Sequence, residues 1–66
     1  MEFEIVFDHE EDGRWIAAIE TLPGVLAYGA TRTEARSKAQ ALALRVIADQ
    51  IEAGQTVPDQ VRFAAA

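Results

Sequence analysis

Residues 29–35 of the chain read GATRTEA, and this stretch marks the change from a series of strands to a helix. Thr31 and Glu34 have the spacing of a capping box, in which the hydroxyl and the carboxylate each accept a hydrogen bond from a free backbone N–H at the helix start. Glu34 also complements the positive end of the helix dipole. The stretch therefore predicts that a helix begins at Thr31.

Apolar side chains recur at helical spacing after this start. One predicted core stripe consists of Ala35, Ala39, Leu42 and Val46, with Ala53 as a further candidate. A second apolar stripe beside it contains Leu44, Ile47 and Ile51, together with Ala48. This apolar arc is wider than one sheet face needs, so we expect Leu44, Ile47 and Ile51 to form an oligomer interface. Gly54 is expected to end the helix as its C-cap, and Pro58 to prevent its resumption.

Three segments upstream of the helix have the pattern of strands. Residues 2–8 alternate between apolar and polar side chains, residues 14–20 are apolar on both sides, and residues 25–30 form the third segment. Asp12 and Gly13 tolerate the positive φ of a hairpin loop. Pro23 and Gly24 are typical of a tight turn, because Pro fixes φ and Gly accepts a left-handed geometry. These short connections predict an antiparallel meander.

After the helix, residues 61–63 alternate again and predict a short fourth strand, whereas residues 64–66 carry no structural signal. The predicted fold class is α+β with the order β-β-β-α-β: a three-stranded antiparallel meander, one long helix and a short fourth strand. The sequence contains no internal repeat and no linker. We therefore expect residues 1–66 to form a single domain.

The length and composition predict support from a second subunit. A domain of 66 residues buries only about 60% of the surface that its unfolded chain exposes. Such small folds usually need disulfides, a bound metal or a partner subunit for stability. Cysteine is absent and there is one histidine, which argues against disulfides and a zinc site. We therefore predict self-association as a dimer or tetramer, and no metal or cofactor.

The charge balance points to a protein partner. Six basic residues face eleven acidic ones, for a net charge of −5, whereas phosphate backbones are bound through clustered Lys and Arg. An acidic surface instead favours encounter with a basic protein. No segment has the length of a membrane-spanning helix, and the first residues lack the pattern of a signal peptide. We expect a cytoplasmic protein that binds no nucleic acid directly and no membrane.

Four motifs follow one another along the chain: the acidic hairpin with its aromatic residue at 8–15 (DHEEDGRW), the turn at 22–25 (LPGV), the helix start at 29–35 (GATRTEA) and the helix end at 54–58 (GQTVP). In this order they resemble the motifs of the HicB-like antitoxins. Together they cover residues 3–58 at the spacing of the family. Each motif alone is common, and it is their combination that is specific.

The resemblance implies a partial ribonuclease-H-like fold and a role in neutralising HicA, a small basic toxin that cleaves messenger RNA. Members of the family cover the active surface of the toxin and commonly assemble as dimers or tetramers. Many also carry a C-terminal DNA-binding domain. Residues 59–66 are all that follow Pro58 here, so we expect a short, single-domain member without direct promoter binding.

The candidate site residues gather around the predicted hairpin. The expected partner-binding residues are Asp8, Glu10, Glu11, Asp12, Trp15 and Tyr28. The carboxylates are also compatible with a solvated loop or with a divalent-metal site, and the aromatic residues with core or interface anchors. No convergent catalytic set is recognisable, so we expect no enzyme and no catalytic residues. Pro23, Gly24, Thr31, Glu34 and Gly54 are assigned structural roles.

Three functions follow from these observations. The leading hypothesis is an antitoxin-like module that binds a small basic HicA-type toxin. The first alternative is a stand-alone oligomeric protein of the same fold, with a structural or small-ligand role. The second alternative is a vestigial metal-dependent nuclease, for which Asp8 and Glu34 are the available carboxylates.

Overall fold

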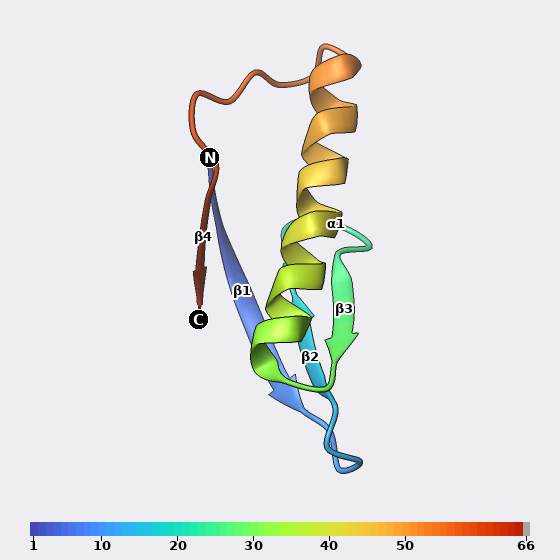
Figure 1. Cartoon of the computed structure of the whole chain (residues 1–66). Helices are drawn as coiled ribbons and strands as arrows, with labels where there is room; N and C mark the ends of the chain where they lie inside the picture. Colours follow the sequence, from blue (N-terminus) through green and yellow to red (C-terminus); the bar gives the residue numbers. More distant parts are fainter. Residues whose placement is uncertain (66) are drawn as a thin grey trace.

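The computed structural model describes residues 1–65, in which one helix packs against a four-stranded mixed sheet (Figure 1). The elements follow the chain as β1 (Glu2–His9), β2 (Trp15–Ala18), β3 (Leu26–Gly29), α1 (Arg32–Glu52) and β4 (Arg62–Ala65). The predicted α+β class with a single helix is therefore confirmed. The predicted strand at 14–20 is shorter than expected, and the predicted strand at 2–8 extends one residue further, to His9.

The strands lie in the order β3-β2-β1-β4, so β1 and β2 are the two interior strands. β1 pairs with β2 and β2 pairs with β3 in antiparallel fashion, whereas β4 runs parallel to β1. The chain thus leaves the sheet at one edge, passes through α1 and returns at the opposite edge. The amino group of Met1 donates to the carbonyl of Gln60 at 2.8 Å, which ties the N-terminus to the segment before β4.

The two predicted turns have the backbone geometry that their glycines permit. Gly13 has a φ of +93° in the hairpin between β1 and β2, and Gly24 has a φ of +81° between β2 and β3. Pro23 precedes Gly24, and the N–H of Val25 donates to the carbonyl of Leu22 at 3.2 Å across this turn. Gly24 thus has the left-handed geometry expected of the turn.

The helix begins where its cap predicts. Thr31 is extended, and its Oγ1 accepts a hydrogen bond from the backbone N–H of Glu34 at 3.1 Å. The carboxylate of Glu34 pairs with Nζ of Lys38, one turn further along, at 3.0 Å. The hydrogen bond and positive charge of Lys38 lower the pKa of the Glu34 carboxyl. Thr31 thus caps the start of α1, whereas the Glu34 carboxylate bonds to Lys38 in place of the backbone N–H that a capping box offers it.

The helix ends in a Schellman arrangement around Gly54. Ala53 is the cap residue, and Gly54 follows it with a φ of +74°. The N–H of Gly54 donates to the carbonyl of Ile51 at 3.0 Å, and the next N–H, that of Gln55, donates to the carbonyl of Gln50 at 2.9 Å. These bonds satisfy carbonyls that would otherwise lack partners at the helix end. Gly54 ends the helix as predicted, one position after the cap itself.

Small side chains bring α1 close to the sheet. The buried core consists of Phe3, Ile5, Ala17, Ile19, Leu22, Val25 and Ala27 from the sheet and its turn, and Ala35, Ala39, Ala43 and Ile47 from α1. The two are in close contact at Gly29, where an added Cβ would clash with the backbone N of Ala35 and lie 3.0 Å from its Cα. Glycine is therefore required by space at this position.

The helix is rotated slightly from the orientation that its sequence predicted. Ala43 is fully buried although it was not assigned to the core, whereas Leu42 and Val46 are half-buried at the margin. Ala53 is exposed. Ile47, predicted to lie in an oligomer interface, is only 3% exposed and packs in the core of its own chain. Leu44 and Ile51 do lie on the surface.

Candidate functional site

The two faces of the sheet differ in what covers them. α1 lies along one face, against β2 and β3 (Figure 1). In the part of the chain that the structure describes, no second helix covers the opposite face. The side chains of that opposite face, here called the open sheet face, include five that are apolar or aromatic: Val6, Ile16, Ala18, Leu26 and Tyr28.

These side chains are neighbours because the strand register aligns them. Val6 pairs with Ala18, and Ala18 pairs with Leu26, so the three form a row across β1, β2 and β3. Ile16 and Tyr28 form the next row in the same way. Leu26 is 48% exposed and Tyr28 is 41% exposed. The open sheet face therefore presents five adjoining apolar or aromatic side chains, of which Leu26 and Tyr28 are the most exposed.

β3 is an edge strand, and the backbone groups that it leaves free belong to Leu26 and Tyr28. The N–H of Ile19 donates to the carbonyl of Val25 at 3.1 Å, which fixes the phase of the β2–β3 ladder. Because hydrogen-bonded and non-bonded pairs alternate in an antiparallel ladder, the N–H and C=O of Leu26 and of Tyr28 point away from β2. Such an edge can accept a strand from another protein.

The hairpin between β1 and β2 is linked to this edge. Asp12 accepts hydrogen bonds from the backbone N–H of Arg14 at 3.0 Å and from its side-chain Nε at 2.7 Å. The backbone hydrogen bond from Arg14 is the largest cause of a lowered pKa at the Asp12 carboxyl. The guanidinium of Arg14 also lies over the ring of Tyr28, 4.7 Å from its centroid. Arg14 thereby joins the hairpin to β3.

The other predicted acidic residues have no basic partner. Among residues 1–65 the ion pairs are Arg14–Asp12 and Lys38–Glu34. Asp8 lies in the row of Ile16 and Tyr28, and its carboxylate accepts the N–H of His9 at 2.9 Å. Glu10 and Glu11 lie in the hairpin that follows. The three carboxylates therefore give the end of β1 and the hairpin a negative charge that no ion pair within residues 1–65 offsets.

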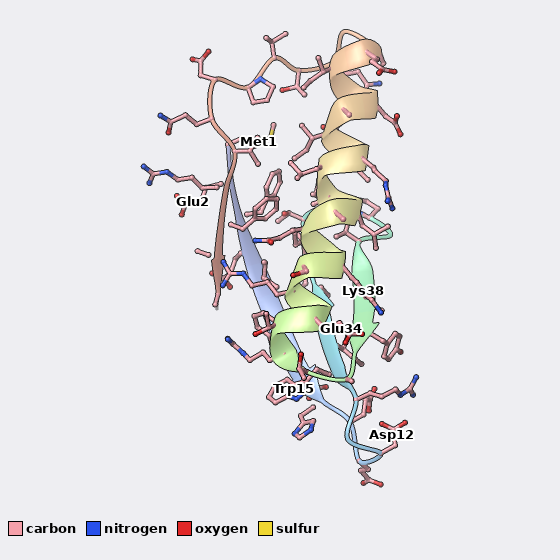
Figure 2. All side chains as sticks on the ribbon, in the orientation of Figure 1. Met1, Glu2, Asp12, Trp15, Glu34 and Lys38 are labelled. Carbon is pink, nitrogen blue, oxygen red and sulfur yellow. The ribbon has the colours of Figure 1, made fainter. Side chains whose placement is uncertain are left out.

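Trp15 does not share this surface. It pairs with His9 in the β1–β2 ladder, and the two rings stack with their centroids 4.2 Å apart and their planes 8° from parallel. It lies in the same alternation as Ala17, so its side chain is on the face that α1 covers. Figure 2 shows Trp15 below the start of the helix and Asp12 at the tip of the hairpin. The structure thus separates Trp15 from Asp8 and Tyr28.

The two carboxylates considered for a nuclease also lie on opposite sides of the sheet. Asp8 is on the open face, whereas Glu34 is in the first turn of α1 over the other face. Within residues 1–65 no three His, Cys, Asp or Glu side chains are grouped as metal ligands would be, and no pocket is present. In the same residues no helix combines the length and apolar character needed to cross a membrane.

The sequence predicts strands, and no site, for most residues of the open sheet face. These residues are Val6, Ile16, Ala18 and Leu26. The signal was nevertheless present, because residues 14–20 are apolar on both sides and Val6 interrupts the polar side of its strand. A strand that is apolar on both sides needs both of its faces covered, and residues 1–65 contain a helix over one face only.

Comparison of the chain with protein-family models, with curated proteins and with solved structures finds no match in any of the three.

Proposed function

We propose that this chain is a protein-binding module whose open sheet face and acidic hairpin bind a small basic protein. The observation that carries the proposal is an uncovered apolar sheet face that ends in unpaired carboxylates. Apolar surface of this kind marks interaction sites in soluble proteins. The free edge of β3 beside it provides backbone donors and acceptors for a partner strand.

Charge defines the class of partner. Asp8 lies at the end of the open sheet face and Glu10 and Glu11 lie in the hairpin that follows, and none of the three carboxylates has an ion-pair partner within residues 1–65. A basic partner would be attracted to this end and oriented by it, because charge complementarity raises association rates and fixes the register of docking. Arg14 is already engaged by Asp12 and Tyr28, so it offers little opposing charge.

The motif resemblance specifies the partner further. On this basis the chain is a short HicB-like antitoxin of the cytoplasm, with a partial ribonuclease-H-like fold, and its partner is a small HicA-type toxin that cleaves messenger RNA. Neutralisation would follow from covering the toxin's active surface with the open sheet face. No catalytic group of the chain itself takes part.

The test is inhibition of RNA cleavage by a HicA-type toxin encoded beside this chain. Purified chain is titrated into the toxin at a fixed RNA concentration. We expect inhibition to saturate at a fixed molar ratio. Leu26→Arg places a positive charge on the open sheet face and should weaken inhibition by roughly tenfold or more, because buried central contacts dominate interface energy.

The matched control is Val57→Arg, which introduces the same charge at an apolar residue that is 83% exposed and lies after the helix. This variant should inhibit as the unmodified chain does. Absence of a complex at micromolar concentrations would contradict toxin neutralisation. Equal loss of inhibition in both variants would contradict the assignment to the open sheet face.

A further inference from the structure

The helix carries a second apolar stripe on the side away from the sheet. This outer stripe consists of Ala41, Leu44, Ala48 and Ile51, and all four residues are exposed. Their spacing is three, four and three residues, which is the spacing of a helix–helix seam. Leu44 is 49% exposed and Ile51 is 42% exposed. The buried residues of α1 are Ala35, Ala39, Ala43 and Ile47, on another side of the helix, so the core within residues 1–65 does not require large apolar side chains in the outer stripe.

We propose that a second copy of this chain covers the outer stripe, with the two α1 helices packed antiparallel. The stripe alternates small and large side chains along the helix. In an antiparallel pair centred on Val46, Leu44 of one copy faces Ala48 of the other, and Ile51 faces Ala41. Every contact then joins a large side chain to a small one, which fills space evenly.

A parallel pair lacks this fit. In a parallel pair each residue faces its own equivalent, so alanine meets alanine and a large side chain meets a large one in alternation along the helix. The large pairs hold the helices apart and leave gaps at the alanines. The outer stripe therefore packs better against a copy that runs in the opposite direction.

The charges beside the outer stripe also favour the antiparallel pair. Lys38, Arg45, Asp49 and Glu52 are exposed, and helical geometry places them along one side of the stripe. In the antiparallel pair this side meets the same side of the other copy, so Lys38 of one copy, which pairs with Glu34 of its own helix, also lies near Glu52 of the other. Arg45 lies close to the twofold axis, beside both Arg45 and Asp49 of the other copy. The favourable contact is therefore Lys38 with Glu52, and twofold symmetry forms it twice.

This dimer leaves the proposed partner surface free. The outer stripe and the open sheet face lie on opposite sides of the chain, since the core of α1 and the sheet separate them. A dimer through α1 therefore presents two open sheet faces outward. It provides two equivalent sites for a partner protein, whichever protein that is.

The first test is the mass of the purified chain alone, measured by light scattering or sedimentation across a dilution series. We expect a dimer that dissociates on dilution, because a single-helix interface is small. Leu44→Glu should raise the dissociation constant roughly tenfold or more. Val57→Glu introduces the same charge at an exposed apolar residue off the stripe, and it should leave the constant unchanged.

The second test examines helix direction by charge reversal. Glu52→Lys should weaken the dimer several-fold, because it places a lysine side chain near Lys38 of the other copy. Adding Lys38→Glu to the same chain should restore association. Circular dichroism of each variant confirms that α1 is intact, so that the readout is association alone.

A monomeric mass throughout the series, with the fold retained, would overturn the proposed dimer. Equal association by Leu44→Glu and the unmodified chain would do the same. Failure of the double reversal to restore association would overturn the antiparallel arrangement. None of these experiments contains a toxin, so their failure is distinct from failure of the proposed antitoxin function.

Discussion

The two faces of the sheet are built from the same strands but have opposite relations to the rest of the chain. On the covered face, Ile5 and Ala17 are fully buried in the core that the sheet shares with α1. On the open face, the adjacent Val6 and Ala18 are half-buried, and Leu26 is about half exposed. The covered face holds the fold together. The open face is apolar without serving the core, and we therefore assign it to a partner.

This contrast predicts that neighbouring residues of β1 respond differently to the same change. Ile5→Ala removes a fully buried side chain and should lower the free energy of unfolding by about 3 kcal/mol, within the usual range for core truncations. Val6→Ala on the open face should lower it by less than about 1 kcal/mol. Urea unfolding of both variants measures the difference. Similar losses would show that the two faces are equally part of the core.

The close approach of β3 to α1 gives the second-largest effect. Gly29→Ala places a Cβ against the backbone of Ala35, so the strand and helix must separate. We expect a loss of about 1–3 kcal/mol, typical of overpacking. Tyr28→Ala, one residue earlier on the open face, should lose less than about 1 kcal/mol even though it removes the contact with Arg14. A Gly29→Ala variant as stable as the unmodified chain would contradict the close packing of the covered face.

The start of the helix over the covered face gives a smaller effect. Thr31→Ala removes the hydroxyl that accepts the N–H of Glu34 and should lower the free energy of unfolding by about 1 kcal/mol. Thr33→Ala, an exposed threonine in the same first turn that makes no cap, is the control and should have little effect. Thermal unfolding followed by circular dichroism compares the two. An equal loss of thermal stability in both variants would contradict the role of Thr31 as the helix cap.

Acidification gives the smallest effect and tests the ion pair beside this cap. The pKa of Glu34 is lowered below its ordinary value of 4.5, mainly by the hydrogen bond from Lys38. The ionised carboxylate therefore stabilises the fold above that value, and the contribution is lost as the pH falls through the lowered pKa. Glu34→Gln should be slightly less stable than the unmodified chain near neutral pH and equal to it in acid. A difference that persists in acid would contradict this account.

The sequence predicted the features that depend on local chemistry. Thr31 and Gly54 delimit the helix through bonds to backbone groups within a turn, and Gly24 adopts the positive φ of its turn. These features need no knowledge of distant contacts. The α+β class follows from the strands and the helix that they separate.

The rotation of the helix and the composition of the site depend on contacts between distant residues. α1 is apolar on two sides, so periodicity alone did not distinguish Ile47, which is buried, from Leu44, which is exposed. The choice is made by small residues such as Gly29 and Ala35, which let the helix approach. Likewise, Trp15 and Tyr28 are both aromatic, and only the register of the strands places them on opposite faces.

The central claim is that the open sheet face and the edge of β3 bind the partner. The most direct measurement is amide hydrogen exchange of the chain alone and in the presence of a small basic HicA-type protein, the partner class that we propose. The amides of Leu26 and Tyr28 point away from β2, so we predict fast exchange in the free chain and strong protection in the complex. Exchange at these two amides that is unchanged by a saturating partner would contradict the claim.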